Sequence, residues 1–144
     1  MKNRTVEELD KSRYNMMLWF TIGWGIWFGS FILKDIIENY ALRGILLFLA
    51  LVSWVIWTKQ LLKQRKLLKI MNANKTLSNA LNDELVAYNL LKSSQVGFWS
   101  LLNTTVLCLI ISAYTDISAI LVTEIILFFG VLSALIAWLF YNKN

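Results

Sequence analysis

The chain has 144 residues, of which 58% are hydrophobic, and it carries a formal net charge of +5, one cysteine and no histidine. An average soluble domain has about 45–50% apolar residues, so this excess excludes an ordinary soluble domain of this size. A single cysteine excludes an internal disulfide, and the missing histidine excludes His-based acid–base chemistry, haem ligation by histidine and a common kind of zinc site.

The apolar residues fall into four blocks, which predict four membrane-spanning helices in an all-α membrane protein. The first block has the length of a lightly tilted helix across a bilayer core of about 30 Å. It is longer and bulkier than the apolar part of a signal peptide, which predicts a retained first span. Only Thr115 and Asp116 separate the last two blocks, which predicts a tight hairpin. The predicted spans are Met16–Leu33, Gly44–Thr58 with a continuation toward Leu62, Val96–Tyr114 and Ile117–Tyr141.

These spans divide the chain into five parts. The predicted parts are a cytoplasmic tail (1–15), spans one and two (16–58), a cytoplasmic segment (59–95), spans three and four (96–141) and a short tail (142–144).

The orientation follows from the distribution of basic residues. One predicted side of the membrane has only Lys34 and Arg43. All other basic residues lie on the opposite side: Lys2, Arg4, Lys11, Arg13, Lys59, Lys63, Arg65, Lys66, Lys69, Lys75, Lys92 and Lys143. Basic loops stay in the cytoplasm, so both termini are predicted to be cytoplasmic in an inner (plasma) membrane.

The cytoplasmic segment has the pattern of a helical hairpin between spans two and three. Residues 59–95 contain no proline and no glycine, and the asparagines in Met71–Asn74 favour a turn. A stripe of apolar residues recurs at helical spacing: Leu77, Leu81, Leu85 and Tyr88. The stripe predicts a contact with a cytoplasmic protein partner or with further copies of the chain. The alternative is a basic loop that lies against anionic lipid headgroups.

Glu124 is the sharpest single candidate for a functional residue. It lies in the apolar run AILVTEIILFF, where a carboxylate at mid-bilayer costs about 2.5–3.5 kcal/mol on insertion scales. One interpretation is structural, with Glu124 near the outer surface in contact with water, Arg43 or Lys34. The other is the binding of an ion, a proton or a ligand.

Two further groups of residues in the spans are candidates. Asn103, Thr104 and Thr105 form a polar step in span three, which predicts hydrogen bonds between helices or to their own carbonyls. The alternative is that they line a polar pathway with Glu124. Gly25 and Gly29 give span one a small-xxx-small face, which predicts helix packing within or between subunits.

No motif for catalysis, a cofactor or a metal is found in the sequence. There is no Gly-rich phosphate loop, HExxH, CxxC or serine-nucleophile elbow. The basic cluster Lys63, Arg65, Lys66 and Lys69 has no aromatic residues interleaved with its charges, so nucleic acid is not a predicted partner.

The stretch NDELVAYNLLKSSQVGFW, Asn82 to Trp99, supports one resemblance. It resembles the segment that precedes a membrane span in small uncharacterised bacterial multi-pass proteins. The matching residues are Asp83, Glu84, Lys92, Ser93, Gly97 and Phe98, whereas Leu85 stands where arginine is usual. The resemblance implies a bacterial plasma-membrane protein and no particular activity.

The sequence therefore predicts a non-enzymatic membrane protein that acts through protein–protein contacts, as a sensor, immunity or regulatory component, and that forms homo-oligomers in the lipid bilayer. The alternative is an oligomeric ion channel or transporter subunit with Glu124 in or near its pathway. An enzyme ranks third, because Glu124 is the one carboxylate within the spans.

Overall fold

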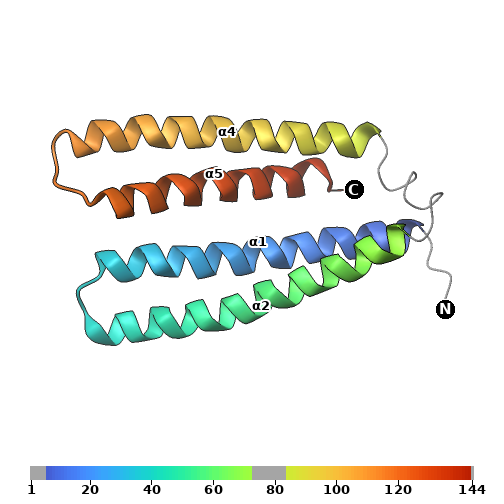
Figure 1. Cartoon of the computed structure of the whole chain (residues 1–144), viewed down its shortest axis with the longest axis horizontal. Coiled ribbons are helices and arrows are strands. Elements are labelled where there is room, and N and C mark those ends of the chain that lie inside the picture. Colours follow the sequence, from blue (N-terminus) through green and yellow to red (C-terminus); the bar gives the residue numbers. More distant parts are fainter. Residues whose placement is uncertain (1–5, 73–83, 144) are drawn as a thin grey trace.

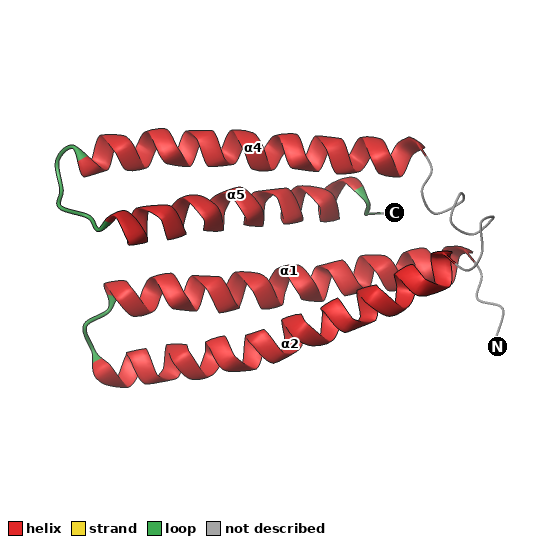
Figure 2. Cartoon of the chain, viewed as in Figure 1, coloured by secondary structure: helices red, strands yellow, loops and turns green. Residues whose placement is uncertain are grey.

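The computed structural model describes residues 6–72 and 84–143, and the regular structure in these ranges is entirely helical (Figure 2). Each of its four helices is long and apolar enough to cross a membrane. The predicted all-α fold, with four helices long and apolar enough to span a membrane, is thereby confirmed. The helices are α1 (Val6–Ile36), α2 (Tyr40–Asn72), α4 (Glu84–Ser112) and α5 (Ala119–Tyr141).

The helices form a row in the order α2, α1, α5, α4 (Figure 1). Consecutive helices pack as two antiparallel hairpins, α1 with α2 and α4 with α5. A smaller contact between α1 and α5 joins the two hairpins. The inner helices of the row are therefore α1 and α5, and α2 and α4 are its edges.

Both connections within the hairpins lie at one end of the row, which we call the turn end (residues 37–39 and 113–118). Asn39 caps α2 because its Oδ1 accepts a hydrogen bond from the amide of Ala41. Ser118 caps α5 in the same way and accepts from the amide of Leu121. These caps fix where the two helices begin. The connection between α4 and α5 is consequently longer than the predicted two residues.

The opposite end of the row, which we call the basic end, contains the first residues of α1 and α4 and the last residues of α2 and α5 (Figure 1). At about 1.5 Å per residue, the 33 residues of α2 extend about 50 Å, well beyond a bilayer core of about 30 Å. Helix α5, with 23 residues, has about the length of one crossing. Most basic residues of the described ranges lie toward the basic end: Lys11, Arg13, Lys59, Lys63, Arg65, Lys66, Lys69, Lys92 and Lys143.

Helix α2 continues beyond its predicted span because the sequence from Lys59 to Asn72 has no helix breaker. This stretch consists largely of leucine, lysine, glutamine and arginine, which favour helix. Helix α4 likewise begins at Glu84, before the predicted span at Val96. The predicted turn of the helical hairpin, Met71–Asn74, lies partly outside the described residues. Leu77 and Leu81 lie wholly outside them.

The side chains buried between the helices are mostly small, and the large apolar side chains mostly point outward. Among the described residues no large side chain is completely buried. This distribution suits a bilayer, because lipid tails are as apolar as the side chains and helices pack through close backbone approach instead. The small residues buried at the helix contacts include Ala50, Ser53, Ser93, Gly97, Gly130 and Ala137.

Candidate functional site

Glu124 lies on α5, five residues after the first residue of the helix at the turn end. This places it about 7 Å along the helix from its start. Its side chain is half-buried, and the Oε2 atom is shielded from the surroundings without a hydrogen-bond partner among the described residues. An open hollow of about 320 Å³ lies beside it, lined by Ala119, Ile120, Thr123 and Glu124.

The cations that were predicted as partners of Glu124 interact elsewhere. Lys34 Nζ lies 3.4 Å from Asp35 Oδ1 on its own helix. The Arg43 Nε–H donates to the carbonyl oxygen of Ile37 at 2.5 Å. Neither cation forms an ion pair with Glu124, so the carboxylate has an oxygen available to accept a proton or a donor group.

Asn103, Thr104 and Thr105 do not form one polar group in the structure. The hydroxyl of Thr104 donates to the carbonyl oxygen of Ser100, and that of Thr105 donates to Leu101, both at 2.8 Å. These bonds lie within α4, one of the two arrangements that the sequence predicted for these side chains. Asn103 is exposed and forms no hydrogen bond with a described residue. The residues that line the hollow beside Glu124 all belong to α5, so the polar step of α4 is separate from it.

Gly25 and Gly29 lie at the contact between α1 and α5. A Cβ atom at Gly25 would lie 3.4 Å from Leu132 Cδ1, and one at Gly29 would lie 3.5 Å from the ring of Phe128. These are ordinary van der Waals distances. The ring of Phe128 also stacks on Trp24 and Phe28, with centroid distances of 5.9 and 6.1 Å. The contact between the hairpins is therefore largely aromatic.

The closest helix contacts involve two glycines, Gly97 and Gly130, for which the sequence predicted no packing role. A Cβ atom at Gly97 would lie 2.6 Å from Ala134 Cβ and 2.9 Å from the carbonyl oxygen of Gly130. One at Gly130 would lie 3.0 Å from Leu101 Cβ. The four-residue intervals between Ser93 and Gly97 and between Gly130 and Ala134 are small-xxx-small patterns that would have identified this contact.

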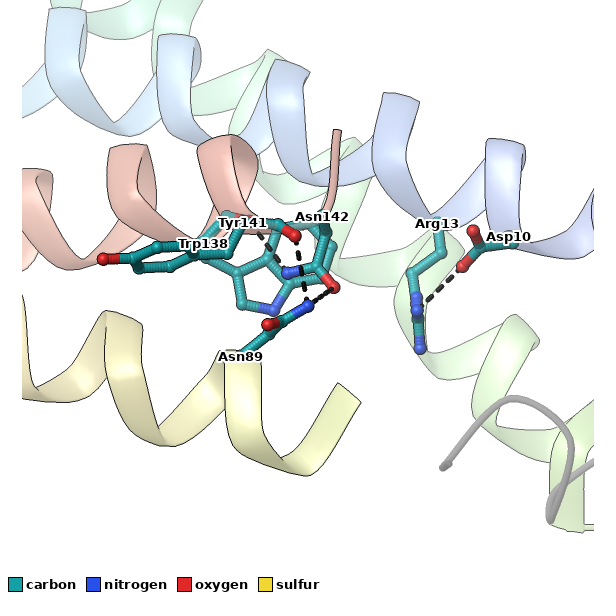
Figure 3. A network of polar contacts seen from close by, with 6 residues as sticks. All are labelled: Asp10, Arg13, Asn89, Trp138, Tyr141 and Asn142. Atoms are coloured by element: carbon teal, nitrogen blue, oxygen red, sulfur yellow. Dashed lines mark hydrogen bonds and ion pairs between the residues drawn. The ribbon is translucent and has the colours of Figure 1, made fainter. Parts of the chain in front are cut away.

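A polar network ties the C-terminal end of α5 to α4 at the basic end (Figure 3). The Asn89 side-chain amide donates to the carbonyl oxygen of Tyr141 at 3.1 Å and to Asn142 Oδ1 at 3.4 Å. Asn142 in turn donates to the carbonyl oxygen of Trp138 at 2.8 Å. Asn89 is buried, and these bonds satisfy carbonyl groups that the end of a helix leaves open.

Helix α1 contacts the same region through Arg13 (Figure 3). Its guanidinium carbon lies 5.9 Å from the centre of the Trp138 ring, and its Nη2 lies 2.7 Å from Asp10 Oδ1. A cation over an aromatic face is attracted by the ring quadrupole. The basic end thus joins three helices through a few side chains.

The described part of the predicted apolar stripe is exposed. Leu85 is 64% exposed and Tyr88 is 53% exposed, both in the first turns of α4. Lys92 follows one turn later, with its Nζ 4.8 Å from the centre of the Tyr88 ring. No described residue covers this face at the start of α4.

The sequence predicted no role for two buried polar atoms on α2. Trp57 Nε1 and Gln60 Oε1 have no hydrogen-bond partner among the described residues. They lie near the contact with α1, where the Trp57 ring stacks on Trp27 at a centroid distance of 5.6 Å. No sequence signal distinguishes Gln60 from the neighbouring polar residues of α2.

Within residues 6–72 and 84–143, no group of three or more His, Cys, Asp or Glu side chains is placed to hold a metal ion. Comparison with protein-family models, with curated proteins and with solved structures finds no match to this chain.

Proposed function

We propose that the chain is a small, non-enzymatic integral membrane protein of the bacterial plasma membrane that acts through protein–protein contacts. It serves as a sensor, immunity or regulatory component and forms homo-oligomers. The observation that carries the proposal is that α1, α2 and α4 are longer than one membrane crossing requires. Their extra length supports a position beyond the lipid for exposed side chains of α4, among them Leu85 and Tyr88.

The proposed orientation places the basic end in the cytoplasm. Positively charged segments next to spans remain on the cytoplasmic side, and the turn end has only Lys34 and Arg43. Both termini are then cytoplasmic, and the contact surface formed by Leu85 and Tyr88 faces the cytoplasm. Exposed apolar side chains outside the membrane favour a protein partner, because water is a poor environment for them.

Site-specific photocrosslinking in living cells tests this proposal. A photoreactive phenylalanine analogue in place of Leu85 is expected to give a protein adduct of defined mass, with either a partner protein or another copy of the chain. The matched control is the same analogue in place of Tyr114, which is even more exposed (87%) but lies at the turn end. Equal adducts at both positions, or none at position 85, would contradict the proposal.

The second candidate function is an oligomeric ion channel or transporter subunit. It is favoured by the shielded Glu124 Oε2, which has no hydrogen-bond partner among the described residues and lies beside an open hollow. A carboxylate held in an apolar span is costly, and such residues commonly mark ion or proton pathways.

For this candidate, purified protein in liposomes is expected to give a proton or cation flux that Glu124→Gln lowers at least tenfold. The substitution removes the charge and keeps the shape of the side chain. Asp116→Asn, which removes a carboxylate from the exposed connection at the turn end, is expected to leave the flux unchanged. A flux that is absent, or equal in the two variants, would rule out this function.

A further inference from the structure

The outer face of α4 carries a stripe of side chains at alternating intervals of three and four residues. We call these residues the α4 outer stripe: Val96, Trp99, Asn103, Val106 and Ile110. Such intervals place side chains on one face of a helix and are typical of helices that interlock in pairs. Trp99 is 63% exposed, Val106 55% and Ile110 54%, so no described residue covers this face.

Asn103 lies at the centre of the stripe and deep within the span. It is seven residues from Val96 and nine from Ser112, or about 10 and 13 Å along the helix. Of the serine, threonine and asparagine side chains between these two residues, Asn103 alone makes no hydrogen bond with a described residue. The others donate to carbonyl oxygens: Ser100 to Phe129 of α5, Thr104 to Ser100, Thr105 to Leu101 and Ser112 to Cys108.

A free amide at this depth needs a partner that lipid cannot supply. The hydrocarbon core contains no water to accept or donate a hydrogen bond, and an unpaired amide in such a medium is strongly disfavoured. The side chain of Asn103 is too short to reach the headgroups. A second helix that offers a donor and an acceptor at the same depth would satisfy it.

We propose that the α4 outer stripe is the interface with a second copy of this chain, with Asn103 hydrogen-bonded to Asn103 of the second copy. Copies in one membrane share the same orientation, so the same residue lies at the same depth in each. An amide has both a donor and an acceptor and is self-complementary across a two-fold axis. Helix α4 also lies at the edge of the row, with its packed neighbour α5 on one side.

A second exposed face of α4 shows what a lipid-facing surface of this helix looks like. It carries Phe98, Leu102 and Leu109, all apolar and exposed. Phe98 lies about 140° around the helix from Asn103. The polar residue is thus confined to one of the two exposed faces, which makes that face the interface and the other the lipid contact.

The stripe continues toward the basic end at the same spacing. Leu85, Tyr88 and Lys92 precede Val96 at intervals of three and four residues. Two copies joined at Asn103 would therefore bring their Leu85 and Tyr88 side chains together outside the membrane. The inference rests on the proposed oligomer and specifies its interface. The Leu85 crosslink can succeed whether or not Asn103 is involved, so failures of the two proposals are distinguishable.

Disulfide crosslinking of the full-length protein in liposomes tests the interface directly. Both variants are made in a Cys108→Ala background, because Cys108 is the single native cysteine. Val106→Cys, which lies in the stripe and keeps Asn103, is expected to give a covalent dimer on mild oxidation, and Phe98→Cys is expected to give at least tenfold less. Equal crosslinking at the two positions, or none at position 106, would overturn the proposal.

A second experiment measures the affinity of the dimer without any crosslink. The affinity is obtained from energy transfer between labelled copies at several protein-to-lipid ratios. Asn103→Leu is expected to weaken dimerisation about tenfold. Asn103→Gln, which keeps the amide, is expected to restore most of the affinity. An unchanged affinity in Asn103→Leu would contradict the proposal, as would a loss shared equally by both variants. Thermal unfolding of Asn103→Leu should match that of the parent at the same dilution, because Asn103 makes no hydrogen bond within the described chain.

Discussion

Replacing Gly97 with alanine is expected to destabilise the α4–α5 hairpin by about 1–3 kcal/mol, the usual cost of forcing an extra carbon into a packed contact. The new Cβ would lie 2.6 Å from Ala134 Cβ and 2.9 Å from the carbonyl oxygen of Gly130. Neither obstacle is the end of a flexible side chain, so the two helices must move apart. Thermal or denaturant unfolding of the purified protein in detergent micelles measures the loss.

The matched control for Gly97 is Gly44→Ala on α2. Apart from the backbone of its own helix and its chain neighbours, no described atom lies within 4 Å of a Cβ at Gly44, and the position is helical. Alanine is favoured over glycine within a helix by about 1 kcal/mol, so this variant should be slightly more stable than the parent. If both substitutions raise the stability, Gly97 is not required for the close approach of α4 and α5.

Phe128→Ala is expected to separate the two hairpins while leaving each of them intact. The Phe128 ring stacks on Trp24 and Phe28 and lies against Gly29, so it is central to the small contact between α1 and α5. Two aromatic pairs contribute about 0.5–1.5 kcal/mol each, which gives an expected loss of about 1–3 kcal/mol. Truncating an aromatic side chain in a soluble core also loses the free energy of hydrophobic burial. That loss is absent here, because lipid tails can replace the ring.

A thiol crosslink between α1 and α5 reports on this separation. A Cβ at Gly25 would lie 3.4 Å from Leu132 Cδ1, so Gly25→Cys with Leu132→Cys in a Cys108→Ala background should be joined by a short bifunctional thiol reagent. Adding Phe128→Ala should lower the yield several-fold. Adding Phe140→Ala instead, which removes an exposed ring of the same helix, should leave it unchanged. Equal yields would show that other residues hold the hairpins together.

The four long apolar helices were predictable because a membrane span requires about 20 consecutive apolar residues, and that signal does not depend on how the helices pack. The ends of the helices were less predictable. Ser118 ends the connection at the turn end by capping α5, and a single serine next to an apolar run does not reveal this by its position. The continuation of α2 to Asn72 was expected from the absence of proline and glycine after Lys59.

The packing faces could not be derived from the apolar pattern. In a soluble helix the apolar face is the buried face, but in a bilayer both lipid-facing and buried positions are apolar. Small residues are then the remaining signal. They indicated the side of α1 that carries Gly25 and Gly29, whereas the tighter contact at Gly97 and Gly130 was not selected.

The candidate polar residues were identifiable by type, and their partners were not. Glu124 and Asn103 stand out in any apolar run. Whether a hydroxyl such as that of Thr104 bonds to its own helix or to a neighbour depends on its rotamer, which the sequence does not specify. The isolation of Asn103 on an outer face depends on where α5 lies, a long-range property of the fold.

The order of the helices in the row also determines how the chain assembles. Contacts within α1–α2 and within α4–α5 join residues that are close in the sequence, so little chain entropy is lost when each hairpin closes. The contact between Gly29 and Phe128 joins residues about one hundred positions apart and closes a far longer loop. We therefore expect each hairpin to enter the membrane and form early, and the docking of α5 against α1 to be the slow, final step of folding.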